Sequence, residues 1–397
     1  MSSDLTYGGD AINAGSVSAG YVQFVSKIPS TTTVSSSPNP STFGGSAAFA
    51  IAVSTNDGVT ATGSVSLSDG SLGLGSCTLT AGACTITISN LSVGSHSITA
   101  RFGGDLTHQP STSAVLTQQV DRAPTTTAIN SSPNPSAYGG TVTLTATVTS
   151  GAGNPTGTVS FSDGSTPIGS CTLGSLTATS CTFSTAALTV GNHSLTAYYN
   201  GDANRAPSLS AVRTQTVNTV TTTTTLTSSA NPVAYGTAIT FTAVVSTASA
   251  TGTVSFSDGT SGVTIGSCGL SSGRCSITVS TLMPGLHPIS ARYGGDALYS
   301  GSASSAVNQT VNKLASSTSQ TASATTVAYG SPVTLTATVT PSAATGTVTF
   351  YDGTAGATVG TCILASGSCS YVATTLTVGS HTIGATYGGD AILLGSN

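Results

Sequence analysis

The sequence has no tryptophan and no glutamate, and only 5% of its 397 residues carry a charge. It also has only two methionines and eight lysines and arginines together. Because strong helix formers are so scarce, long helices are not expected. Threonine, serine, glycine, alanine and valine dominate instead, and β-branched side chains suit a pleated sheet. The composition therefore predicts an all-β protein.

The low charge also narrows the range of partners. A formal net charge of −4 leaves no basic stripe for phosphates and no polybasic patch for anionic lipid. No apolar run reaches the roughly 18 residues that a membrane span needs. The first thirty residues lack the positive start and apolar core of a signal peptide. We therefore expect no nucleic-acid partner and no membrane insertion.

A short motif recurs along the chain at a nearly fixed interval. It reads Phe102-Gly-Gly-Asp105 in one copy and Tyr293-Gly-Gly-Asp296 in another, and successive aspartates are 95, 97, 94 and 94 residues apart. The aspartates are Asp10, Asp105, Asp202, Asp296 and Asp390. Three further landmarks keep the same interval: an Asp-Gly turn at Asp69, Asp163, Asp258 and Asp352, a histidine at His96, His193, His287 and His381, and an aromatic-Gly corner at Phe43, Tyr138, Tyr235 and Tyr329. A fixed period indicates one unit copied in tandem.

Within each copy, short alternating runs are separated by turn residues. In the second copy, residues 141–149 alternate Val142, Leu144, Ala146 and Val148 with threonine, which is typical of a strand with one buried face. The second copy has seven such runs, the number of strands in an immunoglobulin-type sandwich. The predicted fold is an all-β tandem array of seven-stranded Ig-like β-sandwiches in an elongated rod.

Four stretches of sequence carry a resemblance to a known family. The Pro-Asn-Pro corner, the run TGTVSFSDG, the run GSHSITA and the YGGD turn resemble the bacterial Ig-like domain repeats of large surface proteins. The fourth copy lacks the Pro-Asn-Pro corner and reads Ala322-Ser323-Ala324 instead. The resemblance covers almost the whole chain and implies a spacer or adhesive role outside the cell, but it indicates no ligand.

The repeat divides the chain into five parts. The first, residues 1–28, is predicted to be an orphan last strand, either a donor strand or the end of a preceding repeat. The predicted Ig-like domains follow at residues 29–121, 122–218, 219–312 and 313–397, and the last of them lacks its final strand. Short connectors without a long Gly/Ser tract should limit movement between neighbouring domains.

Cysteines fall two to a copy, which predicts local disulfides and an oxidising compartment. The expected pairs are Cys77 with Cys84, Cys171 with Cys181, Cys268 with Cys275, and Cys362 with Cys369. Each pair flanks a turn, so we expect each bridge to join the two strands of a hairpin. A tetrahedral metal site is disfavoured because each copy offers only two cysteines, with its histidine a dozen or so residues away.

The recurring histidines and aspartates are interpreted as structural. Each histidine opens a strand, and no nucleophile or carboxylate partner for catalysis is visible in the sequence. His108 lies outside the repeat and has no partner motif. A calcium site between the two kinds of aspartate is an alternative, but each turn supplies a single acid. Aspartates that accept backbone N–H bonds in turns explain the pattern better.

The sequence contains no recognisable catalytic motif. We find no phosphate-binding loop, no nucleophile elbow, no zinc-protease motif and no paired carboxylates. Isopeptide crosslinks would need buried lysines, and the two lysines, Lys27 and Lys313, lie in connectors. We therefore predict a protein that is not an enzyme and uses no cofactor and no metal.

Glycans could modify the chain at four Asn-X-Ser/Thr sequons. These are Asn90, Asn130, Asn192 and Asn308. Such sequons arise often by chance in a chain so rich in serine and threonine, and their occupancy stays open.

The two ends of the chain show an irregularity of the repeat. Residues 7–27 align without a gap on residues 293–313, and the fourth copy stops where its last strand should start. The predicted donor residues of the first part are Val17, Tyr21, Val22, Phe24 and Val25, and the predicted acceptor end is Ile392, Leu393 and Leu394. Both stretches are more apolar than their internal counterparts, as expected for surfaces that become covered.

From these ends we expect a structural subunit of an extracellular or cell-surface fibre. Its N-terminal strand would enter the incomplete C-terminal domain of the next chain, giving a head-to-tail homopolymer. The alternative is a spacer or adhesive segment of a longer multi-Ig cell-surface adhesin. Host or neighbouring-cell glycans or proteins then stay open as partners, although the loops contain few of the aromatic residues that binding surfaces favour.

Overall fold

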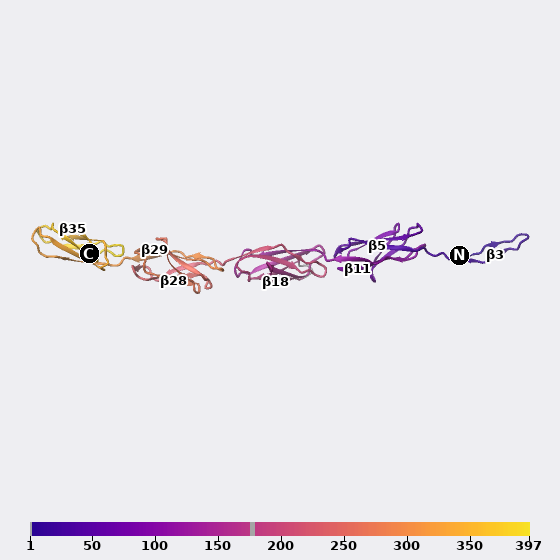
Figure 1. The fold of residues 1–397 in the computed structure, drawn as a ribbon, viewed down its shortest axis with the longest axis horizontal. Coiled ribbons are helices and arrows are strands. Elements are labelled where there is room, and N and C mark those ends of the chain that lie inside the picture. Colours follow the sequence, from indigo (N-terminus) through magenta and orange to yellow (C-terminus); the bar gives the residue numbers. More distant parts are fainter. Residues whose placement is uncertain (1, 175–178) are drawn as a thin grey trace. The chain divides into compact units, whose positions relative to one another are not determined.

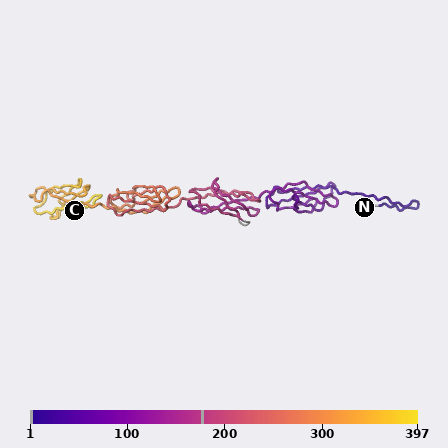
Figure 2. The backbone as a smooth tube through the Cα atoms, turned by 90° about the horizontal axis from the view of Figure 1, so that it is seen from below, coloured from indigo at the N-terminus to yellow at the C-terminus, as the bar shows by residue number. Residues whose placement is uncertain are grey.

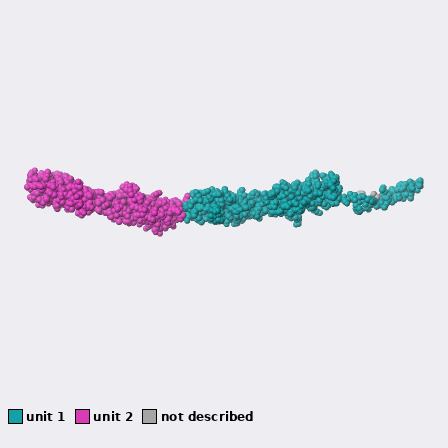
Figure 3. Space-filling model, viewed as in Figure 1, with its two compact units in different colours: residues 1–217 teal, residues 218–397 magenta. Residues whose placement is uncertain are grey.

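The computed structural model describes residues 2–174 and 179–397. Within these residues every regular element is a β-strand, and no helix is long and apolar enough to cross a bilayer. Each of four sandwiches is built from one contiguous stretch of chain, as the colours of Figures 1 and 2 show. Contacts group the chain into two compact units, Met1–Val217 and Asn218–Asn397 (Figure 3). The all-β Ig-like prediction is confirmed.

The first domain consists of a three-stranded sheet facing a larger one. The sheets have the strand orders β10-β7-β5 and β6-β13-β11-β8-β9, and β12 pairs with β11. The strands are β5 Ser30–Ser37, β6 Ser41–Thr42, β7 Ala47–Thr55, β8 Ser64–Asp69, β9 Leu72–Thr78, β10 Ala83–Ile88, β11 Gly94–Phe102, β12 Ser111–Thr112 and β13 Leu116–Asp121.

The second and third domains repeat this topology strand for strand. The second has β14 Thr125–Ser132, β15 Ser136–Ala137, β16 Val142–Ser150, β17 Gly157–Asp163, β18 Thr166–Leu173, β19 Ser180–Thr185, β20 Gly191–Tyr199, β21 Ser208–Leu209 and β22 Arg213–Asn218. The third has β23 Thr224–Ser228, β24 Val233–Ala234, β25 Ile239–Val245, β26 Thr253–Asp258, β27 Val263–Gly269, β28 Arg274–Val279, β29 Gly285–Tyr293, β30 Ser302–Ala303 and β31 Val307–Asn312.

The fourth domain has fewer strands. Its sheets have the orders β32-β33-β36 and β35-β34-β37. The strands are β32 Ser317–Ala322, β33 Val333–Thr340, β34 Thr347–Asp352, β35 Ala357–Ile363, β36 Ser368–Ala373 and β37 Ile383–Tyr387. Among the described residues it has no counterpart of the last strands β13, β22 and β31.

The residues before the first domain form two short ladders. Strand β1 (Ser2–Ser3) pairs with β4 (Tyr21–Val22), and β2 (Thr6–Tyr7) pairs with β3 (Ser16–Val17). We call residues 2–25 the N-terminal segment. Two-residue ladders of this kind contribute little stability of their own.

Each core forms where the inward faces of the two sheets meet. In β16, valine, leucine and alanine are buried at every second position, and threonines occupy the positions between them. Phe241 from one sheet and Phe256 from the other are fully buried in the third domain. The strict alternation specifies register, because a slip by one residue would turn the apolar set toward water.

The four predicted cysteine pairs form disulfides, but they do not join hairpins. Cys268 lies on β27, at the edge of the larger sheet, whereas Cys275 lies on β28, at the edge of the smaller sheet. The chain therefore crosses from one sheet to the other at the intervening turn. Each bridge joins the two layers along one side of the sandwich.

Candidate functional site

The aspartate of the Tyr-Gly-Gly-Asp motif organises the turn that follows it. Oδ1 of Asp296 accepts the backbone N–H groups of Leu298 and Tyr299, each at 2.8 Å. Oδ2 accepts the backbone N–H and the hydroxyl of Thr251, also at 2.8 Å. Asp105, Asp202 and Asp390 make the same set of contacts in their own domains.

These contacts lower the pKa of the aspartate in the motif. Burial opposes ionisation of Asp296, but the N–H groups of Thr251 and Leu298 outweigh it and hold the pKa of this carboxyl well below its usual range. Both carboxylate oxygens therefore face donors, which supports the turn interpretation over a calcium site. Within the described ranges, no group of three or more His, Cys, Asp or Glu side chains is placed to hold a metal.

The recurring histidine has a carboxylate partner that the sequence did not indicate. Nδ1 of His287 lies 2.7 Å from Oδ2 of Asp258, and its Nε2 lies 2.7 Å from the carbonyl oxygen of Met283. The pairs His96–Asp69, His193–Asp163 and His381–Asp352 repeat this arrangement at 2.5 to 2.6 Å. Nε2 faces a backbone carbonyl in every copy, and in the fourth copy the Thr377 hydroxyl also lies 3.5 Å from it.

The protonated ring fits this environment. Carboxylate and carbonyl oxygens only accept hydrogen bonds, so both ring nitrogens must donate, as they do in imidazolium. Burial opposes the charge on His287, but the Met283 carbonyl and the Asp258 carboxylate outweigh it and raise the pKa of the ring. The pKa values of His96, His193 and His381 are raised as well. The contacts and the raised pKa values favour an ion pair between each ring and its carboxylate.

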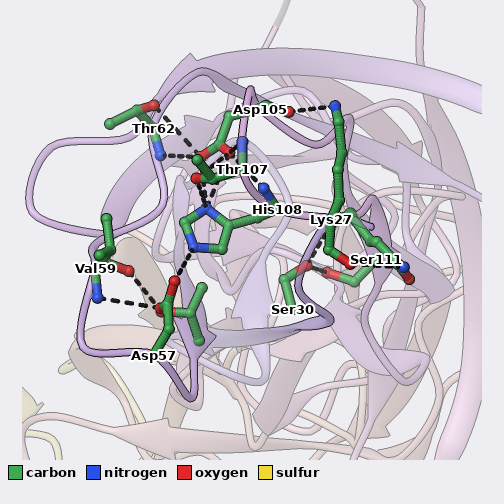
Figure 4. A network of polar contacts seen from close by, with 11 residues as sticks. Lys27, Ser30, Asp57, Val59, Thr62, Asp105, Thr107, His108 and Ser111 are labelled. Atoms are coloured by element: carbon green, nitrogen blue, oxygen red, sulfur yellow. Dashed lines mark hydrogen bonds and ion pairs between the residues drawn. The ribbon is translucent and has the colours of Figure 1, made fainter. Parts of the chain in front are cut away.

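His108 has partners too, contrary to the sequence-based expectation. Its ring is fully buried, with Nδ1 2.9 Å from the Asp105 carboxylate and Nε2 3.3 Å from Oδ2 of Asp57 (Figure 4). The hydrogen bond to the Asp105 carboxylate is the main contact that raises the pKa of this ring. Lys27 reaches the backbone oxygen of Asp105 from the connector. The two ring nitrogens point to different carboxylates, so this cluster fastens a loop.

In the three complete domains, the last strand is held by side chains as well as by the sheet. Gln309 of β31 is fully buried, and so are its equivalents Gln118 and Gln215. Nδ2 of Asn231 donates to the carbonyl of Asn308 at 2.7 Å, and its Oδ1 accepts the N–H of Thr310 at 2.9 Å. Asn39 and Asn134 bind the last strand in the same bidentate way.

The fourth domain presents an open edge where this strand is absent. Strand β29 is nine residues long, whereas β37 has five, because residues 379–382 have no neighbouring strand to pair with. A groove of about 760 Å³ lies beside them. It is lined by residues of both layers, among them Gln320, Thr325, Tyr329, Leu335, Val378 and Ile383. We call residues 378–383 the open edge.

Apolar side chains are uncovered around the groove. Ile289 is fully buried in the third domain, but its equivalent Ile383 is only partly buried. Tyr235 is half-buried, whereas its equivalent Tyr329 is 79% exposed. Unpaired backbone groups beside exposed apolar surface favour the addition of a strand.

The corner of the fourth domain also differs from its counterparts. Counting from Tyr329, Thr325 stands where Asn231 stands in the third domain, so the replaced corner is Ala324 to Thr326 and not residues 322–324. A threonine side chain has no amide and cannot make the bidentate contact of Asn231. A strand in this groove is therefore held by fewer contacts than β31.

The predicted acceptor residues lie elsewhere. Leu393 is fully buried in the core of its own domain, and Ile392 packs against that core. The N–H of Leu314 donates to the Ile392 carbonyl at 2.8 Å, so the connector covers this turn. Of the three residues only Leu394 is exposed, at 52%. The prediction that residues 392–394 form an uncovered end is therefore wrong, and the uncovered edge of this domain is residues 378–383.

The predicted donor residues are all exposed in the N-terminal segment. Their exposed fractions range from 60% for Val17 to 89% for Val25. The pairs Ser3 with Tyr21 and Thr6 with Val17 reproduce the register of Ile289 with Val307 and Arg292 with Ala303. The segment thus repeats the pairing of the next-to-last and last strands of the complete domains.

Val17, one of the predicted donor residues, has no vacant position to fill in the fourth domain. Tyr387 and Ser396 exchange backbone hydrogen bonds of 2.8 and 3.1 Å, as the equivalent residues Tyr293 and Ser302 pair in the third domain. Asn397 therefore stands where Val17 would lie. The vacant positions correspond to residues 18–25.

The four sequon asparagines are all exposed: Asn90, Asn130, Asn192 and Asn308. Their side chains are accessible to a glycan, although Oδ1 of Asn192 accepts the Thr216 hydroxyl at 2.9 Å.

Comparison with known proteins bears on the fold. The model of the bacterial Ig-like domain (group 3) family matches residues 33–121, 129–218, 226–312 and 320–397. A solved tetra-tandem repeat from the extending region of a large adhesion protein is 16% identical over 93% of this chain and 97% of its own, with a TM-score of 0.42. Fibronectin(III)-like modules of Clostridium thermocellum CbhA are 20% identical over 46% and 94%, with a TM-score of 0.19. No curated protein matches.

Proposed function

Because this chain belongs to the bacterial Ig-like domain (group 3) family, we propose that it is a structural subunit of an extracellular fibre or stalk, linked head to tail by strand donation. Four successive sandwiches with cross-layer disulfides suit a load-bearing role in an oxidising environment. The partner of each chain is a second copy of itself.

The observation that carries the proposal is the match between a groove and a strand. The fourth domain has every long strand of its neighbours except the last, and a groove of about 760 Å³ lies beside the open edge. The N-terminal segment carries a last strand with no sandwich around it. Residues 18–25 of one copy would complete the fourth domain of another.

The burial pattern of the internal strands indicates how the donated strand would lie. In β31 the side chains of Gln309 and Val311 are buried, whereas Asn308 is exposed. The corresponding inward residues of the N-terminal segment are Gln23 and Val25, and the corresponding outward residue is Val22. Donor and acceptor are different surfaces, so repeated donation gives an open filament unless the rotation between copies closes a ring.

Donation requires the N-terminal segment to rearrange. Val22 now pairs with Ser2, and Tyr21 pairs with Ser3. The β1–β4 ladder has only two residues on each strand. Donation would replace this short ladder with a longer pairing along the open edge. The exchange also covers apolar residues that are exposed on both partners.

The register that the N-terminal segment shares with the complete domains favours a second candidate function. Because its pairs match those of complete domains, the segment equally suits the end of a preceding sandwich in a longer array. In that case the chain is a spacer or adhesive segment of a multi-Ig surface protein. The last strand of the fourth domain would then come from residues that follow in the same chain.

Electron microscopy and sedimentation velocity over a range of concentrations test the proposal. The oxidised chain should form filaments, Val25→Asp should prevent them, and the matched control Val22→Asp should preserve them because that side chain faces outward. Single particles at every concentration, or filaments of Val25→Asp equal to those of the unmodified chain, would contradict donation and favour the spacer.

A further inference from the structure

We propose that a serine and a buried glutamine five residues apart set the register of the last strand, and that Ser18 and Gln23 are the pair that the groove of the fourth domain recognises. This inference rests on the proposed function, since it names what the open edge selects in its partner strand. In the three complete domains the pair is in place.

The serine binds a backbone group of the neighbouring strand. The N–H of Ala291 donates to Oγ of Ser304 at 2.9 Å, and the N–H of Ser304 donates to the Ala291 carbonyl at 2.8 Å. Ser113 and Ser210 make the same two contacts with Ala100 and Ala197. In each domain the serine therefore fixes one point of the last strand on β29 or its equivalent.

The glutamine fixes a second point at the end of the first strand and the corner that follows it. Nε2 of Gln118 donates to the carbonyl of Pro38 at 3.2 Å, and Nε2 of Gln215 donates to that of Pro133 at 3.0 Å. In the third domain Oε1 of Gln309 accepts the hydroxyl of Ser228 at 2.6 Å. The last strand is thus held at the corner after the first strand in the first two domains and at the end of the first strand in the third, as well as at its sheet neighbour.

The buried amide costs stability, which points to a role in specificity. Oε1 of Gln118 and Oε1 of Gln215 are buried and have no hydrogen-bond partner. A fully buried polar atom without a partner is unfavourable. An apolar side chain would fill the same space without that cost, and single buried polar residues are known to specify register at the expense of stability.

The N-terminal segment carries the same pair, and the groove offers matching partners. Ser18 and Gln23 have the spacing of Ser304 and Gln309. By position in the repeat, Ala385 corresponds to Ala291, and Ala324 corresponds to Pro38 and Pro133. Residues 320–331 line the groove with the exception of Ser323, so Ala324 lies at its wall.

The side chain that now occupies the edge has to be displaced. Nε2 of Gln320 donates to the carbonyl of Ile383, a backbone group on the open edge. In the third domain this position of the first strand is Leu226, a buried core residue. An entering strand takes over the edge and releases Gln320, so occupancy of the groove is readable at the amides of residues 379–385.

A peptide titration tests the inference. The receptor is the full chain with Val25→Asp, whose own strand is disabled and whose fourth domain is unchanged. The probe is a synthetic peptide of residues 14–27. It is compared with an inward swap, Tyr21→Gln with Gln23→Tyr, and a matched outward swap, Val22→Phe with Phe24→Val. Both swaps keep the composition, and hydrogen exchange at residues 379–385 reports binding.

We expect the unmodified and outward-swapped peptides to protect these amides with similar affinity. The inward swap should bind about tenfold more weakly or worse, because it leaves the groove carbonyl without its donor. Equal binding of the two swapped peptides, or no protection by any peptide, would overturn the inference. Failure of the proposed function looks different, because then the unmodified chain stays monomeric at all concentrations while the peptide still protects the edge.

Discussion

Nδ1 of His287 lies 2.7 Å from Oδ2 of Asp258, and the same pair recurs in all four domains. In the third domain the Asp258 side chain is 4% exposed and that of His287 is 11% exposed. The pair is therefore shielded from salt and solvent, and its protonation is coupled to folding.

The chain should be most stable at mildly acidic pH. The pKa of His287 is raised above its ordinary value of 6.5, so its contribution is complete below that pH and is lost as pH rises through the folded pKa. Burial opposes ionisation of Asp258, but the His287 contact outweighs it and lowers the pKa below 3.8, so this contribution is lost only in stronger acid. Calorimetry should show melting temperatures that fall from about pH 6 to about pH 9. His287→Gln should weaken this dependence for the third domain, and melting temperatures that rise over this range would contradict the assignment.

Removing the turn aspartate should destabilise one domain. Asp202→Ala leaves the N–H groups of Thr156, Asn204 and Arg205 without their acceptor. We expect a loss of roughly 1–3 kcal/mol in the free energy of unfolding, measured by urea denaturation. Asp202→Asn keeps an amide oxygen that can accept from the turn, so it should lose clearly less. Equal losses for the two variants would show that the charge matters and not the hydrogen bonds.

In the Tyr-Gly-Gly-Asp motif, replacing the second glycine should destabilise the domain far more than replacing the first. Gly295 has a φ of +85°, and a Cβ there would lie 2.8 Å from the nitrogen of Gly301, whereas the nearest atom to a Cβ on Gly294 is 3.9 Å away. Gly295→Ala should therefore cost about 2 kcal/mol or more, and Gly294→Ala should be nearly neutral. Urea midpoints of the two variants make the comparison, and similar midpoints would contradict the explanation.

Breaking one disulfide should loosen the two layers of its own domain. The double variant Cys268→Ala with Cys275→Ala should lose about 2–3 kcal/mol, the value expected for closing a short loop. In this variant, adding a reductant should no longer shift the urea transition of the third domain. It should still shift the transitions of the other domains. An unchanged midpoint for the third domain would mean that packing of the layers alone holds them together.

Much of the fold follows from the sequence. The alternation of apolar residues and threonine in β16, repeated at a fixed interval, specifies strands, their inward faces and the number of domains. Such patterns are local, so they do not show which sheet a strand joins. The turn between Cys268 and Cys275 therefore resembled a hairpin, although β27 pairs with β26 and β28 pairs with β25.

Parts of the candidate site could not be predicted from the sequence for the same reason. The partners His287 and Asp258 lie 29 residues apart on different strands, and only the sheet brings them together. The recurrence of both residues at similar spacing in every copy was the signal that could have paired them. The apolar residues 392–394 suggested an acceptor surface, but Leu393 enters its own core because the connector residue Leu314 pairs with it.

Hydrogen exchange of the full, oxidised chain at low and high concentration tests the central claim most directly. The amides of residues 379–381 should exchange quickly when the chain is dilute and become protected as concentration rises. The equivalent amides of residues 285–287, which β31 already covers, provide an internal reference that should stay protected throughout. If residues 379–381 exchange equally fast at both concentrations, no second copy fills the groove, and strand donation is contradicted.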